Sequence, residues 1–346
     1  MKLEYHRYDL TLKYAFTISR SSRQRVAIVI VRFEKDGIVA YGEASPNARY
    51  NETAETVEKF LKKIDLEKLN DPSRLHQITK YLDSLDQNNP SAKCAIDIAM
   101  HDWTCKKNRL PLYKFLGANE HETPLSSFTI GIDNPDGIIQ KVKEASNYPV
   151  LKIKLGSASD EKIIDAVRSV TDKPLRVDAN EGWKSKEEAL DKIKWLATKN
   201  VEFIEQPMPA KQLDDVKWLR ERVNLPLIAD EALSDYSVEE LSKAYDGINI
   251  KLQKNGGLFK SYKLIQDARK YRMKIMLGCM IESSIGITAA AHLSPLVDWN
   301  DLDGNVLISN DPFDGVVNEN GELILSDAPG LGVNPKVNLE FLSLDS

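Results

Sequence analysis

Short apolar runs alternate with longer amphipathic stretches between about residues 125 and 303. Stretches such as SKEEALDKIKWLATKN repeat their apolar residues with the period of a helix, whereas the runs have the length of buried strands. This alternation with short connections is typical of βαβ units and a parallel sheet. The runs are SFTIGI (127–132), VLKIKL (150–155), PLRVDA (174–179), VEFIEQ (201–206), PLIADE (226–231), GINIKL (247–252), KIMLGC (274–279) and VDWNDLD (297–303). Eight such runs predict a TIM-type barrel.

A doubly wound open sheet would give the same alternation. In nucleotide-binding versions of that fold, G-x-G-x-x-G follows a strand, or G-x-x-x-x-G-K-[ST] is present. Neither motif occurs in this sequence. We therefore expect an α/β barrel.

The first 120 residues have a different pattern. Three segments read as strands, with a turn at Asp36-Gly37 before the third, and they predict a small antiparallel sheet. Between the first two strands lies a polar loop, TISRSSRQR (17–25), with three arginines. The strands are expected at residues 1–14, 26–34 and 38–43, and helices at 52–66, 73–86 and 91–107. Taken alone, this part of the chain predicts only an α+β domain.

Composition narrows the class of protein. The chain has 346 residues, 42% of them hydrophobic and 29% charged, with a net charge of −5. A nucleic-acid groove would require a basic excess, and no run of 18 apolar residues predicts a membrane span. Cys94, Cys105 and Cys279 lack metal-binding spacing and favour a reducing, cytoplasmic location.

Charged residues end five successive strand-like runs. They follow one another at intervals of 21 to 27 residues, about one strand–helix unit each, so we expect them at one height on the sheet. The C-terminal ends of barrel strands carry the active site in enzymes of this architecture. Buried charges at such a place are costly unless they are paired or bind a metal. The residues are Lys154, Asp178, Glu205, Asp230 and Lys251.

The three carboxylates of this set predict a metal site. Asp178, Glu205 and Asp230 would supply the oxygen ligands that Mg²⁺ prefers. Lys154 and Lys251 lie on either side of them in sequence, and Lys152 points to the same face as Lys154 because the two are two residues apart on a strand.

These motifs resemble the enolase superfamily, in its muconate-lactonizing-enzyme subgroup. The segments that carry the resemblance are YGEASP (41–46), LKIKLG (151–156), RVDANEGW (176–183), FIEQP (203–207), IADEA (228–232), NIKLQKNGG (249–257) and PGLGV (329–333). The resemblance implies a modified (β/α)₇β barrel over residues 121–314. It also implies an α+β capping domain built from residues 1–120 together with the tail, residues 315–346.

The resemblance further implies the roles of the strand-end residues. Asp178, Glu205 and Asp230 would bind one Mg²⁺ per subunit, and Lys154 and Lys251 would be an acid/base pair. The shared chemistry of the superfamily is removal of a proton α to a carboxylate, through a metal-stabilised enediolate. With one lysine on each face, 1,1-proton transfer inverts the carbon, although the same pair also serves dehydration and cycloisomerisation.

Two features narrow the substrate. The pair Asp301 and Asp303 is similar to the D-x-D of dipeptide epimerases, in which two carboxylates hold the substrate ammonium. The loop 18–25, with 47–52, resembles the specificity lid of L-Ala-D/L-Glu epimerases, where Arg23 would bind the glutamate side chain. Softer candidates for substrate contact are Lys152, Thr129 and Cys279.

We therefore expect a cytoplasmic, Mg²⁺-dependent epimerase of L-Ala-D/L-Glu, an isomerase acting in murein peptide metabolism. Its expected partner is a small dipeptide, with neither nucleic acid nor membrane, and a homo-oligomer is compatible with the sequence. Alternatives are an epimerase of hydrophobic or cationic dipeptides, an N-succinylamino acid racemase or an o-succinylbenzoate synthase. A barrel that binds a ligand without catalysis is the alternative of another class.

Overall fold

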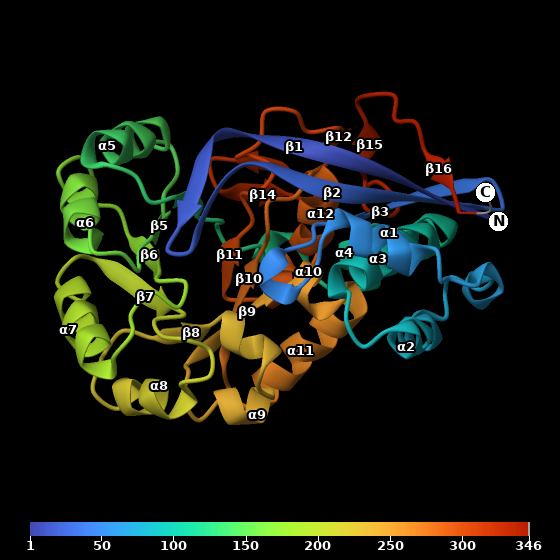
Figure 1. Cartoon of the computed structure of the whole chain (residues 1–346). Coiled ribbons are helices and arrows are strands. Elements are labelled where there is room, and N and C mark those ends of the chain that lie inside the picture. Colours follow the sequence, from blue (N-terminus) through green and yellow to red (C-terminus); the bar gives the residue numbers. More distant parts are fainter. Residues whose placement is uncertain (345–346) are drawn as a thin grey trace.

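The barrel is the larger part of the molecule. A computed structural model describes residues 1–344, and Figure 1 shows the barrel on the left and the cap on the right. Its parallel sheet has eight strands in the order β11-β10-β9-β8-β7-β6-β5-β4. The strands are β4 (Phe128–Ile130), β5 (Leu151–Lys154), β6 (Leu175–Asp178), β7 (Val201–Glu205), β8 (Leu227–Ala229), β9 (Gly247–Lys251), β10 (Lys274–Gly278) and β11 (Trp299–Asp301). Each lies within one of the eight predicted runs.

The sheet is nearly closed at the seam between β4 and β11. Ser126 and Asn300 form a parallel bridge, and the backbone N–H of Ser127 donates to the carbonyl oxygen of Asn300 at 3.1 Å. At least one helix follows each of the first seven strands, which confirms the predicted (β/α)₇β pattern. The helices are α5 (Pro135–Glu144), α6 (Asp160–Arg168), α7 (Lys186–Leu196), α8 (Leu213–Arg220), α9 (Val238–Leu241), α10 (Leu252–Asn255), α11 (Leu258–Lys270) and α12 (Ser284–Ala291).

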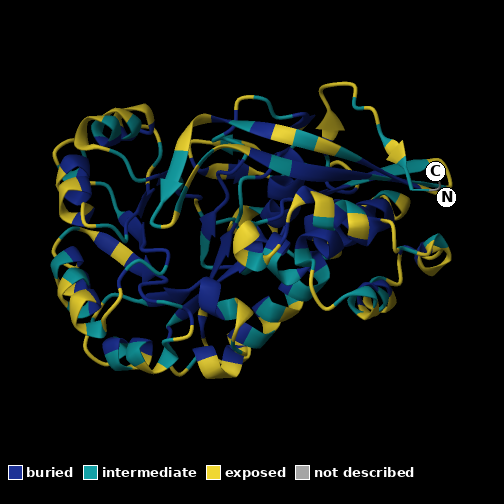
Figure 2. Cartoon of the chain, in the orientation of Figure 1, coloured by how far each residue is buried: buried dark blue, intermediate teal, exposed yellow. Residues whose placement is uncertain are grey.

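The inner strands of the barrel are more buried than the helices around them. Figure 2 shows the barrel strands buried, while the outer helices present exposed residues to solvent. The four residues of β5 and the four of β6 are all buried because helices cover one face and the other lies inside the barrel. This explains why the strands read as short runs that are mainly apolar, with the few charged residues, such as Lys152 and Arg176, buried among them.

The cap is built on a four-stranded antiparallel sheet of order β16-β1-β2-β3. Helix α3 packs against β3 at close range: a Cβ added at Gly42 would lie 1.9 Å from the backbone oxygen of Ala95. The strands are β1 (Lys2–Ile18), β2 (Ser21–Lys35), β3 (Ile38–Ala44) and β16 (Leu342–Ser343). The cap helices are α1 (Ala54–Leu61), α2 (Leu75–Leu85), α3 (Pro90–Lys107) and α4 (Leu112–Phe115).

The polar segment 17–25 is not the loop that the sequence predicts. It is the end of a long hairpin, in which β1 and β2 continue to Ile18 and from Ser21 and leave a two-residue turn. The register shifts between Thr11 and Phe16, which is a bulge. Backbone pairing needs no apolar side chains, so strands can extend through a polar sequence that hydrophobic alternation does not mark.

The tail returns from the barrel to the cap. The backbone N–H of Leu112 donates to the oxygen of Gly330 at 3.0 Å, and the N–H of Leu331 donates to the Asp102 carboxylate at 2.8 Å. After β12 (Phe313–Asp314), the strands of the tail are β13 (Val317–Glu319), β14 (Glu322–Ile324) and β15 (Asn334–Pro335), before β16 joins β1. These contacts confirm a cap made from both ends of the chain, while the boundaries at residues 120 and 315 stay predictions.

His292 connects the barrel to both parts of the cap. The backbone N–H of Tyr113 lies 3.2 Å from its Nδ1, and its Nε2 lies 3.1 Å from the carbonyl oxygen of Leu331. Since an N–H donates and a carbonyl accepts, the ring is neutral with its proton on Nε2. Burial lowers the pKa of His292 to about 4, although the bond to Leu331 acts in the opposite direction.

Two further findings bear on the predicted class. Among the helices of residues 1–344, none has the length and apolar character required to cross a bilayer. Cys94, Cys105 and Cys279 are all free thiols.

Candidate active site

The strand-end charges lie at one height, as their spacing predicts. In the parallel register, Lys154 pairs with Asp178 and Asp178 with Glu205 across β5, β6 and β7. On the other side of the barrel, Lys251 pairs with Gly278 and Gly278 with Asp301 across β9, β10 and β11. All of these charged side chains therefore meet at the C-terminal end of the barrel.

Lys152 lies at the centre of this cluster. Its side chain is completely buried, and its Nζ is 2.6 Å from Asp301 and 2.5 Å from Glu205. Asp178 is further away, at 3.5 Å from the same Nζ, and pairs more closely with Lys154 at 2.6 Å. Burial opposes a charge on Lys152, but Asp301, Glu205 and Asp178 outweigh it and raise its pKa well above the usual value.

Asp230 holds two cations on the other side of the cluster. Its carboxylate is 3.1 Å from the Nζ of Lys251 and 2.9 Å from that of Lys254, which also donates to the Asp230 carbonyl oxygen at 2.6 Å. Lys254 lies beyond the end of β9 and is not among the site residues that the sequence predicts. Its spacing of three residues from Lys251, at the start of α10, was the signal that both could face one carboxylate.

The three carboxylates have the chemistry of a magnesium site. Burial and the charge of Asp178 raise the pKa of Glu205 to about 7, so this carboxylate lacks sufficient positive charge around it. Burial also acts to raise the pKa of Asp178, but Lys154 and Lys152 hold it below its usual value. As the side chains stand, no group of three or more possible ligands within residues 1–344 is arranged to hold an ion. The donor atoms and the charge deficit at Glu205 fit a hard divalent cation, and the ligand roles stay a prediction.

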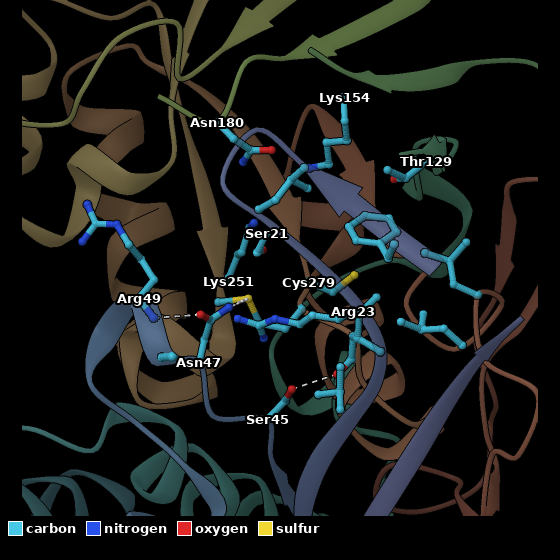
Figure 3. Close-up of a pocket in the computed structure, with 18 of the residues that line it drawn as sticks. Ser21, Arg23, Ser45, Asn47, Arg49, Thr129, Lys154, Asn180, Lys251 and Cys279 are labelled. Atoms are coloured by element: carbon cyan, nitrogen blue, oxygen red, sulfur yellow. Dashed lines mark hydrogen bonds between the residues drawn. The ribbon is translucent and has the colours of Figure 1, made fainter. Parts of the chain in front are cut away.

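A cavity of about 410 Å³ opens above the cluster, between the barrel mouth and the cap. Figure 3 shows Lys154 and Thr129 on one side of it and Lys251 and Cys279 on another. Most of the predicted site residues line it: Arg23, Thr129, Lys154, Asp230, Lys251, Cys279, Asp301 and Asp303. Lys152, Asp178 and Glu205 lie beneath, with no exposed side-chain area.

Asp301 and Asp303 differ in their surroundings. Asp301 receives hydrogen bonds from Ser127 and Lys152 at 2.8 and 2.6 Å, and the two lysines of β5 outweigh burial and lower its pKa. Asp303 accepts the backbone N–H of Thr129 at 2.6 Å. Burial and the charge of Asp301 raise the pKa of Asp303 to about 7, so this group lacks a cation. An ammonium ion in the cavity would supply one.

Thr129 and Cys279, the remaining candidates for substrate contact, also line the cavity. Thr129 donates through Oγ1 to Asp301 at 3.3 Å, and Cys279 donates through Sγ to the Asp301 carbonyl oxygen at 3.3 Å. Burial raises the pKa of Cys279 well above the usual value, so its thiol is not a nucleophile.

Three arginines of the cap reach the cavity wall. Arg20 and Arg49 bind acidic residues of the barrel rim, Glu231 and Glu181. The backbone of Arg23 pairs with Phe16 across the hairpin, but its guanidinium forms no hydrogen bond or ion pair within residues 1–344 and is free to receive a ligand in the cavity. The sequence does not predict that these two arginines bind the barrel rim. Arg20 and Glu231, for example, are 211 positions apart in the chain.

Comparisons with known proteins cover almost the whole chain. The family model for the N-terminal domain of mandelate racemase / muconate lactonizing enzyme matches residues 5–117, and an "enolase C-terminal domain-like" model matches residues 138–338. An L-Ala-D/L-Glu epimerase of Bacteroides thetaiotaomicron is 46% identical over 335 residues, covering 96% of this chain and 88% of the relative. An L-Ala-D/L-amino acid epimerase of Pedosphaera parvula is 43% identical, covering 97% and 100%.

A solved structure of a dipeptide epimerase has the same fold over the whole chain. The dipeptide epimerase from Cytophaga hutchinsonii, complexed with Mg and the dipeptide D-Ala-L-Val, superposes with a TM-score of 0.92 at 26% identity and covers 99% of each chain. The chain thus belongs to the mandelate racemase / muconate lactonizing enzyme group of the enolase superfamily.

Proposed function

We propose that this protein is a Mg²⁺-dependent dipeptide epimerase that inverts the α-carbon of the C-terminal residue, with L-Ala-D/L-Glu as its substrate. The observation that carries the proposal is the pair Lys154 and Lys251, which face one cavity from strands β5 and β9. Four steps separate these strands in the order of the eight-stranded sheet, so they stand on opposite sides of the barrel. The L-Ala-D/L-Glu epimerase relative supports the choice of substrate.

The cavity supplies a separate group for each charged part of such a dipeptide. Asp303, with Asp301, would hold the α-ammonium, because the raised pKa of Asp303 indicates a carboxyl that lacks a cation. Arg23 would bind the glutamate side chain with the two parallel hydrogen bonds that a guanidinium offers a carboxylate. These anchors would place the glutamate α-carbon between the two lysines.

Inversion then follows from the positions of the lysines. One lysine removes the α-proton from one face, and the other delivers a proton to the opposite face. Burial opposes a charge on Lys251, but Asp230 and Glu205 raise its pKa, so it is in the form that delivers a proton. Asp178, Glu205 and Asp230 would hold Mg²⁺, which when bound stabilises the negative charge that develops on the substrate carboxylate.

The metabolic setting we propose is the recycling or breakdown of murein peptides, which contain this dipeptide. The test of the activity is incubation of L-Ala-L-Glu with the enzyme and Mg²⁺ in D₂O. NMR should show deuterium at the glutamate α-carbon together with the D-Glu diastereomer. A folded protein that incorporates no deuterium would contradict the proposal.

A second candidate substrate class is dipeptides with an apolar C-terminal residue. The cavity wall supports it, because large apolar side chains of the cap and barrel line it, among them Leu12, Phe16, Ile18, Val26, Ile281 and Leu307. Turnover of L-Ala-L-Met or L-Ala-L-Leu above that of L-Ala-L-Glu would select this class. N-succinylamino acids and o-succinylbenzoate precursors lack an α-ammonium, so Asp303→Asn should leave their turnover almost unchanged.

A further inference from the structure

Two segments of the cap cover the cavity, and we call them together the lid. The first is the tip of the β1–β2 hairpin, residues 16–25, and the second is the loop 47–51, which contains a short 3₁₀ turn, Ala48–Tyr50. Figure 3 shows Arg23 and Arg49 on different sides of the cavity. The lid holds three arginines at the cavity wall, and their different partners suggest different tasks.

Arg20 and Arg49 are both bound to the barrel rim. Arg20 donates to the Glu231 carboxylate at 2.7 Å and to the backbone oxygen of Asn180 at 3.0 Å. Arg49 donates to both oxygens of Glu181, at 3.2 Å each, and Arg20 is also 3.7 Å from Glu181. One rim glutamate therefore contacts both segments of the lid.

The rim is shaped to receive these arginines. Asn180 and Glu181 have φ values of 43° and 65°, a left-handed backbone that is unfavourable for side chains other than glycine. This backbone presents the Asn180 oxygen to the lid, where it also accepts the hydroxyl of Ser19 at 2.9 Å. The Glu181 side chain is fixed from behind by the backbone N–H of Ala210, at 2.9 Å.

We propose that Arg20 and Arg49 are positioning residues that hold the lid on the barrel rim, and that they leave Arg23 as the lid guanidinium facing the substrate. The assignment of Arg23 to substrate rests on the proposed function, whereas the attachment of the lid does not. Glu181 is the shared acceptor that couples the hairpin tip to the 47–51 loop.

The strength of this attachment suits a lid that must open. The side chains of Arg20 and Arg49 are 33% and 37% exposed, while those of Glu231 and Glu181 are 0% and 14% exposed. Partly exposed ion pairs shift an equilibrium by only a few-fold. Each pair alone would therefore favour the closed lid about threefold, and the two together about tenfold, which still permits a dipeptide to enter.

The test compares Arg20→Gln, Arg49→Gln, Glu181→Gln and the double variant Arg20→Gln/Arg49→Gln. Arg25→Gln is the matched control, because Arg25 is an exposed residue of the same hairpin and does not line the cavity. The first readout is deuterium uptake of residues 15–25 in the protein without substrate, followed by mass spectrometry. The second is the separation of KM from kcat for L-Ala-L-Glu.

We expect faster uptake at residues 15–25 by about threefold in each single variant and about tenfold in the double variant. KM should rise by similar factors while kcat changes less than about twofold, and Arg25→Gln should match the wild type. Adding Glu181→Gln to Arg49→Gln should have a smaller effect than on the wild type, since the two residues form one pair.

Unchanged uptake in the double variant, or the same increase in Arg25→Gln, would overturn the proposal. Loss of kcat in Arg20→Gln or Arg49→Gln at wild-type uptake would do so too, because it would indicate direct substrate contact. If uptake rises as expected but the wild type epimerises no dipeptide, the lid attachment stands and the proposed function fails. If the wild type is active and uptake does not rise, only the lid attachment fails.

Discussion

At the scale of single residues, Arg23 is distinguished by what it lacks. Two other lid arginines are bound to rim glutamates, whereas the guanidinium of Arg23 has no polar partner within residues 1–344 and lines the cavity. We expect Arg23→Gln to lower kcat/KM for L-Ala-L-Glu by about 30- to 160-fold, the effect of about 2–3 kcal/mol from a charged hydrogen-bonded pair. Turnover of L-Ala-L-Met, which has no side-chain carboxylate, should change less than about threefold. Kinetics with both dipeptides test this, and equal losses for the two would contradict a role in side-chain recognition.

The two lysines allow a sharper test of inversion. With Lys154 and Lys251 on opposite sides of the cavity, each should exchange the α-proton of only one diastereomer. Lys154→Met and Lys251→Met should each lose epimerisation by more than about 10³-fold. In D₂O, one variant should still exchange the proton of L-Ala-L-Glu and the other that of L-Ala-D-Glu, as NMR would report. Retained exchange of both diastereomers in either variant would show that the replaced lysine is not the base for one face of the substrate.

The sequence predicts the residues at strand ends better than their partners. Lys154, Asp178 and Glu205 fall at the expected height because the strand–helix repeat sets their positions. The contact between Arg20 and Glu231 depends on how a hairpin of the cap meets a barrel loop, and no local pattern encodes that distance. For the same reason the three carboxylates that surround Lys152 could not be identified from the sequence, and its expected role at the substrate stays a prediction.

At the scale of elements, the close approach of β3 and α3 depends on Gly42. A methyl group there would lie 1.9 Å from the Ala95 carbonyl oxygen, so helix and strand would have to separate. Gly42→Ala should lower the free energy of unfolding by about 3 kcal/mol or more. Gly37→Ala is the control, since its φ is +75° but nothing lies within 4 Å of the added methyl, and it should cost about 1 kcal/mol. Urea unfolding curves measure both, and similar losses would show that β3 can shift away from α3.

The hairpin β1–β2 illustrates why the ends of elements are hard to predict. Hydrophobic alternation marks a strand only where one face is buried, and it stops near residue 14 in β1 and starts again near residue 26 in β2. The backbones continue to pair through Thr17 and Ser22 although both side chains are polar. The part of the hairpin with no apolar pattern is the part that forms the lid.

At the scale of the whole molecule, His292, which joins the barrel to the cap, makes the free energy of unfolding depend on pH. Its pKa is about 4 in the folded state, against about 6.5 for an ordinary histidine. Because the folded state holds His292 neutral, its contribution to stability is complete above pH 6.5. This contribution is lost as the pH falls toward 4, where the unfolded chain binds a proton at this residue. Between pH 7 and pH 4 the wild type should lose about 3 kcal/mol more than His292→Gln, whose amide can donate and accept without titrating. Urea midpoints at four pH values would show this, and parallel curves would mean that His292 does not contribute.

The overall architecture was predictable because the barrel repeats. Eight apolar runs of similar spacing define the sheet, and PGLGV indicates a tail that returns to the cap. The seam between β4 and β11 was not predictable, since it depends on backbone bonds between residues more than 170 positions apart, such as Ser127 with Asn300.

The joining of β16 to β1 has a consequence for how the chain folds as it leaves the ribosome. Strands β1 to β3 are synthesised first, but Leu342 and Ser343, which complete their sheet, emerge after the entire barrel. Throughout translation the outer edge of β1 therefore remains open to pairing with another chain. The charged side chains of Lys2 and Glu4 in this strand would disfavour such pairing until the last strand has been synthesised.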